Sequence, residues 1–104
     1  MDEQEFRLAA DRAFDELQRL LLPIAERGGF DIERHDGVVQ VVFDGPRTGT
    51  FIVSRHAPSR QIWVAAGSRS YKLPWAADAA SFALDGETLA ALLRRLTEEH
   101  LNGG

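Results

Sequence analysis

The sequence predicts an α+β fold: a two-layer α–β sandwich in which an antiparallel sheet of five to six strands is covered on one face by N- and C-terminal helices. Three observations lead to this prediction. Apolar residues recur at three- and four-residue steps near both ends of the chain, as in amphipathic helices. Between them, short segments rich in β-branched residues alternate with turn signals. Two amphipathic helices and a sheet with one apolar face bury their apolar surfaces by packing against each other.

The first segment is expected to form an amphipathic helix. Its apolar residues share one face: Phe6, Ala10, Ala13, Phe14, Leu17, Leu20, Leu21 and Ile24. Pro23 lacks an N–H and clashes with the preceding turn, so the regular helix is expected to end or kink near this residue. Gly28-Gly29 then stops it.

Strand segments follow the first helix. Residues 30–35 and 38–43 flank Asp36-Gly37, a strong two-residue hairpin signal. Further strands are expected over 50–55, 61–66 and 71–73, with a sixth around 81–84.

The chain closes with a second helix. Asp85 is its expected N-cap, and leucines repeat at helical spacing from Leu89 to Leu96. Asn102-Gly103-Gly104 is expected to fray. No repeat or linker interrupts the pattern, so residues 1–104 are expected to form one domain.

Composition limits the possible functions. The chain has 104 residues, a net charge of −4 and no cysteine. Disulfides, cysteine-ligated clusters and cysteine nucleophiles are therefore excluded, and any metal must be held by carboxylates, histidines, carbonyls or water. The longest apolar run is too short to cross a bilayer, and the acidic N-terminus is unlike a presequence. We therefore expect a cytoplasmic protein that does not bind membranes.

Charge is segregated along the chain. Residues 1–36 carry a net −5, residues 37–75 a net +4, and the remaining residues a net −3. Such segregation could serve two different partners, or it could be neutralised locally within the fold.

The most informative segment is the fourth predicted strand with the turn before it. Alternation puts Ile62 on one face and Gln61 with Trp63 on the other. If the helices cover the Ile62 face, Trp63 stands on the open face. Arg55 and Arg60 are then expected nearby, and a tryptophan flanked by arginines is typical of an interface hot spot. The pattern leaves equally open a tryptophan that caps the sheet edge, half buried by a loop.

Acidic residues provide the second signal. Asp11 and Asp15 lie one helical turn apart, with Glu16 adjoining, and Asp31 and Glu33 share one side of the first strand. Clustered carboxylates can bind a cation through oxygen. Three arginines stand four residues from acids on the helix, namely Arg7, Arg12 and Arg19. Composition alone therefore favours ordinary surface ion pairs over a metal site.

Familiar catalytic motifs are not present. The sequence has no hydrolase elbow, phosphate-binding glycine loop or dinucleotide fingerprint. The histidines His35, His56 and His100 share no metal-site spacing and are interpreted as surface residues, with His56 a partial exception because it adjoins the Trp63 segment. We therefore expect no classical active site.

Taken together, these segments resemble the frataxin family. The specific part of the resemblance is Pro58-Ser59-Arg60-Gln61-Ile62-Trp63-Val64, supported by Gly49-Thr50-Phe51-Ile52-Val53, the Asp36-Gly37 hairpin, Glu5-Phe6 and Asp85-Gly86-Glu87. The resemblance spans nearly the whole chain in the right order, and the compact length suggests the bacterial type. It implies the α–β sandwich predicted above.

The resemblance also implies a function. Frataxins are iron-binding adaptors and regulators of iron–sulfur cluster assembly that bind a cysteine desulfurase and its scaffold protein. The family's tryptophan and glutamine correspond to Trp63 and Gln61, Ser54 stands in place of the usual asparagine, and His56 follows two residues later. The expected partner contacts are therefore Ser54, Arg55, His56, Arg60, Gln61 and Trp63.

An acidic ridge for weak binding of iron, as Fe²⁺ or Fe³⁺, is the other implied site. It corresponds to Asp11, Asp15, Glu16, Asp31 and Glu33, and it is thinner than usual because the second half of the first helix has few acids. We expect no organic cofactor and a monomer when metal-free. The alternatives are an iron storage or ferroxidase-type iron chaperone and a nucleic-acid-binding sheet, although a pI near 5.3 disfavours the latter.

Overall fold

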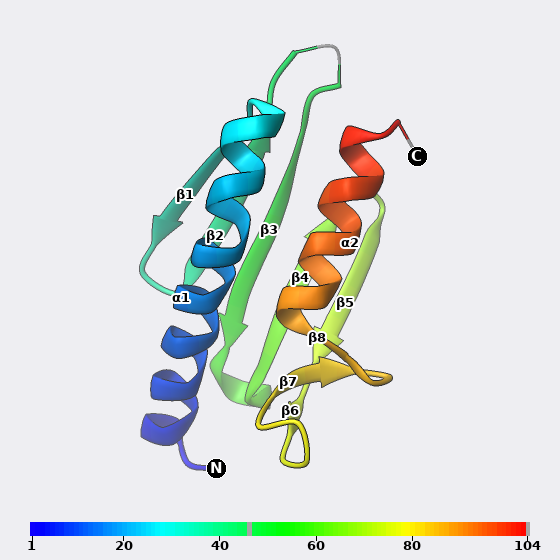
Figure 1. The fold of residues 1–104 in the computed structure, drawn as a ribbon. Coiled ribbons are helices and arrows are strands. Elements are labelled where there is room, and N and C mark those ends of the chain that lie inside the picture. The colour runs from blue at the N-terminus through cyan, green and yellow to red at the C-terminus, as the bar shows by residue number, and fades with distance from the viewer. Residues whose placement is uncertain (46, 104) are drawn as a thin grey trace.

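In a computed structural model of the protein, which describes residues 1–45 and 47–103, two helices lie side by side on one face of a twisted sheet (Figure 1). The elements in chain order are α1 (Glu3–Gly28), β1 (Asp31–His35), β2 (Val38–Phe43), β3 (Gly49–His56), the 3₁₀ turn η1 (Ala57–Ser59), β4 (Gln61–Ala66), β5 (Arg69–Leu73), β6 (Trp75–Ala76), β7 (Ser81–Leu84), β8 (Glu87–Thr88) and α2 (Leu89–Leu101). Strands β1 to β5 form one antiparallel sheet in sequence order, and β6, β7 and β8 form a small second sheet. The predicted α–β sandwich is confirmed.

Helix α1 runs from an N-terminal capping box to the predicted glycine stop. A capping box opens it, because the Asp2 carboxylate accepts from the Glu5 N–H at 2.7 Å and Glu5 accepts from the Asp2 N–H at 3.2 Å. The helix continues through Pro23 and ends at the glycine pair, where Gly29 adopts a left-handed φ of 70°. An end at Pro23 is therefore wrong: buried Leu21 and Ala25 on either side hold the backbone helical although one hydrogen bond is missing.

Helix α2 begins later than predicted. Thr88, rather than Asp85, is its N-cap, and the Thr88 hydroxyl accepts from the Ala91 N–H at 3.3 Å. Asp85 and Gly86 instead form the two-residue turn of the β7–β8 hairpin, with positive φ values of 52° and 82°. Asp-Gly is the pair that such turns favour; the signal that located the β1–β2 hairpin is present here too, but Asp85 was interpreted as a helix N-cap.

The core lies between the helices and one face of the sheet. In β2 and β4, every second side chain is buried, and each of these buried positions faces α1 and α2. Phe82 of β7 closes the core beneath the N-terminal part of α1, with its ring edge-to-face against Phe6 at 5.8 Å. The other face of the sheet is left uncovered, and it carries the alternate set of side chains.

The predicted strands 38–43 and 61–66 match β2 and β4, whereas the two-residue strands β6 and β8 were not predicted. Asn102 and Gly103 follow α2 as a turn, and Gly104 lies outside the described residues. Within residues 1–45 and 47–103, no helix combines the length and apolarity needed to cross a membrane.

Candidate partner interface and acidic edge

Trp63 projects from the uncovered face of the sheet. Its strand neighbours Ile62 and Val64 are buried beneath the helices, whereas Gln61 and Trp63 are only half-buried. The antiparallel register places Trp63 opposite Ser54 of β3 on one side and Lys72 of β5 on the other. The predicted open-face position of Trp63 is thus confirmed.

The Trp63 ring is held in place by three neighbours. The His56 ring stacks on it with centroids 3.6 Å apart and an angle of 11° between planes. The Lys72 ammonium lies 4.8 Å from the ring centroid, a cation–π contact from the opposite neighbouring strand. The indole Nε1–H donates to the Gln61 side-chain oxygen at 3.0 Å. Trp63 is therefore a preorganised aromatic group rather than a freely rotating one.

The turn before β4 supports this arrangement. His56 Nδ1 lies 2.7 Å from the Ser59 hydroxyl, which fixes the imidazole over the indole. Arg60 takes a left-handed φ of 54° at the end of η1, and its guanidinium donates back to the Ala57 carbonyl. Arg60 is therefore part of the turn's own hydrogen bonding and directly precedes β4.

An apolar hollow adjoins Trp63 on the same face. It has a volume of about 320 Å³, and Ile52, Trp63 and Tyr71 are among its lining residues, with Ser54 and Lys72 as polar groups. Ile52 is 39% exposed, one of the most exposed large apolar side chains of the described residues. Strand alternation could have identified Ile52, because it lies two residues before Ser54 and so shares its face.

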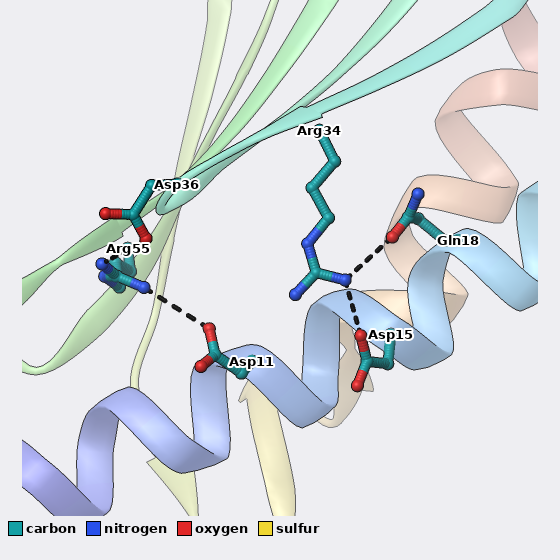
Figure 2. A network of polar contacts seen from close by, with 6 residues as sticks. All are labelled: Asp11, Asp15, Gln18, Arg34, Asp36 and Arg55. Atoms are coloured by element: carbon teal, nitrogen blue, oxygen red, sulfur yellow. Dashed lines mark hydrogen bonds and ion pairs between the residues drawn. The ribbon is translucent and has the colours of Figure 1, made fainter.

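Arg55 does not belong to this face. It pairs across strands with Ile62, which is buried under the helices, and its guanidinium donates to Asp11 of α1 at 3.4 Å and to Asp36 of the β1–β2 turn at 3.1 Å (Figure 2). The expectation that Arg55 lies beside Trp63 is wrong. Residues two apart on a strand share a face, so Arg55 follows buried Val53.

Two acidic residues of α1, Asp11 and Asp15, face arginines of the sheet. Arg34 of β1 reaches across the sheet edge and donates to Asp15 at 2.5 Å and to Gln18 at 2.8 Å (Figure 2). Asp11 takes the contact from Arg55. Helical spacing suggested that Asp11 and Asp15 pair with Arg7 and Arg19 of the same helix. Among the described residues, their ion pairs are instead with arginines of the sheet.

The five predicted metal ligands are not gathered at one place. Asp31 and Glu33 alternate with Arg34, so they point to the open face while Arg34 points toward α1. Glu16 lies on the other flank of α1, in a groove shared with Trp75 and Phe82. Over residues 1–45 and 47–103, no three histidine, aspartate or glutamate side chains lie close enough together to hold a metal ion.

Glu87 and Arg95 form an ion pair at α2 in which the pKa values of both groups are shifted. Arg95 binds Glu87 with two hydrogen bonds, at 2.8 Å and 2.9 Å. These hydrogen bonds hold the pKa of the Glu87 carboxyl below its usual value and raise the pKa of Arg95. The pair fastens β8 to α2 on the side away from Trp63, so it contributes to the fold rather than to the candidate interface.

The fold and its exposed groups define a small α–β sandwich whose notable surface is an open sheet face with an anchored tryptophan. Comparison with known families extends this description. Residues 1–103 match the frataxin-like domain, and the chain belongs to that family. The architecture also matches a frataxin of the CyaY protein family from Psychromonas ingrahamii, with a TM-score of 0.69 and 17% sequence identity over 95% of this chain and 90% of that one. The resemblance found in the sequence is thus confirmed.

Membership in this family assigns an iron-related role in iron–sulfur cluster assembly, at the level of the family.

Proposed function

We propose that this protein is a non-catalytic adaptor of iron–sulfur cluster assembly that docks through the open sheet face around Trp63 onto a cysteine desulfurase and its scaffold protein. The observation that carries the proposal is the ordered indole of Trp63, held between His56 and Lys72 on a face that the helices leave uncovered. Large aromatic side chains of this kind dominate binding energy at protein interfaces.

A side chain that is already ordered in the free protein favours binding. A mobile contact side chain must be immobilised on binding, which costs about 0.5–1.5 kcal/mol of binding free energy for each one. The stack with His56 and the hydrogen bond to Gln61 have already removed that freedom from Trp63. Ile52 and the adjoining hollow supply apolar area for a partner side chain. In this proposal Ser54 and Gln61 provide hydrogen bonds, and Lys72 replaces Arg55 beside Arg60 as the source of positive charge.

Iron binding forms the second part of the proposal. Asp31 and Glu33 are exposed carboxylates on the open face. Among the described residues they join no group of three metal-ligating side chains, which leaves most of the coordination of Fe²⁺ or Fe³⁺ to water, so we propose weak and exchangeable binding. The protein would act in this way as a cytoplasmic monomer.

The alternatives receive less support. A ferroxidase or storage role would need a gathered ligand set, and within the described residues no group of three forms. A nucleic-acid-binding sheet would need free aromatic faces for base stacking. His56 from β3 and Lys72 from β5 flank the Trp63 ring from opposite strands, so a base would have to displace one of them.

The test is binding of desulfurase to purified wild type and to Trp63→Ala, measured by calorimetry. Truncating an interface hot spot costs about 2 kcal/mol or more, so Trp63→Ala should bind at least about thirtyfold more weakly. Leu22→Ala is the matched control, because Leu22 is 49% exposed on α1, in the layer that covers the other face. Equal affinity of Trp63→Ala and wild type would overturn the docking surface.

A further inference from the structure

Two arginines from the sheet reach the acidic side of α1. Arg34 of β1 contacts Asp15 and Gln18, and Arg55 of β3 contacts Asp11 (Figure 2). Asp11 and Asp15 lie one helical turn apart on α1. These two carboxylates are the ones that α1 would offer to a metal ion here, and in this structure each of them already faces a guanidinium.

Neither arginine is a loosely held surface charge. The Arg55 side chain is 16% exposed, and it is fixed from the other side by Asp36 at 3.1 Å and by Gly37, whose backbone lies against the guanidinium. The Arg34 side chain is 29% exposed, and its guanidinium lies 5.9 Å from the Phe14 ring centroid. Partial burial reduces solvent screening, so each arginine is a persistent counter-ion.

We infer that Arg34 and Arg55 act as internal counter-ions that close Asp11 and Asp15 to metal cations and fasten α1 to the sheet. This inference rests on the proposed function. It limits the candidate iron ligands, because it removes Asp11 and Asp15 of α1 from them. The residues present at this edge do not fit a metal: Asp11 and Asp15 each face a guanidinium group, and with Asp36 the five side chains carry only one net negative charge. Arg55 of the basic middle segment contacts Asp11 and Asp36 of the acidic first segment, so part of the segregated charge is neutralised within the fold.

Competition gives the expected size of the effect. A cation that binds Asp11 or Asp15 must give up the attraction between that carboxylate and its arginine, and it must also approach a like charge. An exposed ion pair of this kind corresponds to as much as about a fivefold change in an equilibrium constant. Replacing both arginines should therefore strengthen cation binding at this edge severalfold, up to about 25-fold.

The experiment is a titration with Mn²⁺ of isotope-labelled protein, followed by paramagnetic broadening of amide signals. The variants are Arg34→Gln with Arg55→Gln, the same pair with Asp11→Asn and Asp15→Asn added, and the control Arg12→Gln. Arg12 stands on the same helix, and among the described residues its side chain makes no ion pair with Asp11 or Asp15. Thermal unfolding of each variant is recorded with and without Mn²⁺.

Wild type and the control should leave the amides of residues 11–18 sharp at Mn²⁺ concentrations that broaden them in the double arginine variant. The added asparagines should abolish that gain, and Mn²⁺ should raise the melting temperature of the double arginine variant more than that of wild type or the control. Equal broadening of residues 11–18 in wild type, or no broadening in the double arginine variant, would overturn the inference. Desulfurase binding is measured separately, so a failure of docking through Trp63 is distinguished from a failure here.

Discussion

Truncation of two adjacent residues of β4, Ile62→Ala and Trp63→Ala, should affect stability very differently. Ile62 is 0% exposed beneath the helices, whereas Trp63 is half-buried on the open face. The two substitutions lie at adjacent positions of the same strand. The difference between their losses of unfolding free energy therefore shows which face of the sheet belongs to the core.

The magnitudes follow from the contacts. Truncating a fully buried isoleucine costs about 2–5 kcal/mol, since it leaves a cavity that the core fills only in part. Trp63→Ala loses the stack on His56, worth about 0.5–1.5 kcal/mol, and the cation–π contact with Lys72, worth about 0.5–1 kcal/mol. No closed cavity remains at the surface, so we expect a loss of about 1–2.5 kcal/mol.

Urea unfolding at neutral pH, followed by far-ultraviolet circular dichroism, measures both losses. Ile62→Ala should remove a large part of a total stability that is about 5–15 kcal/mol for domains of this size. If Trp63→Ala destabilises the protein as much as Ile62→Ala does, the indole belongs to the core, and the proposed docking surface would be lost with it.

Two further predictions concern α2. Thr97 is 0% exposed and its hydroxyl has no hydrogen-bond partner among the described residues, so Thr97→Val should raise the free energy of unfolding by about 1 kcal/mol; a lower stability would mean that the hydroxyl is bonded. The pKa of Glu87 is lowered from its ordinary value of 4.5 by hydrogen bonds from Arg95. Because the pKa is depressed on folding, the pair stabilises the protein above about pH 4.5 and loses that effect as pH falls through the folded-state value. Unfolding curves of wild type and Glu87→Gln should therefore converge at acidic pH, and a constant gap between them would contradict this assignment.

Local patterns were sufficient for much of the fold. The alternation in 38–43 and 61–66 located β2 and β4, and it also placed Trp63 on the uncovered face. These predictions succeeded because one sheet face is buried, so the period of two is imposed on every central strand. The glycine pair at 28–29 located the end of α1 for an equally local reason, since a left-handed residue is needed there.

Contacts between the layers were the part that spacing did not predict. The distances along α1 suggested that Asp11 and Asp15 pair with arginines of the helix, but Arg55 and Arg34 of the sheet take those places. Helical spacing describes neighbours on one surface, and a partly buried arginine from another layer competes more strongly than an exposed one. The predicted metal ligands are separated by strand geometry. Side chains alternate along β1, so Glu33 points to the open face whereas Arg34 points toward α1.

The most direct test of the docking surface is a map of amide and indole signals of the labelled protein upon addition of the desulfurase. Docking through the open face predicts that the Trp63 indole N–H and the amides of Ser54 and Gln61 shift or broaden first, while α2 is unaffected. Changes confined to the outer surfaces of α1 and α2, with the Trp63 indole signal unmoved, would contradict it.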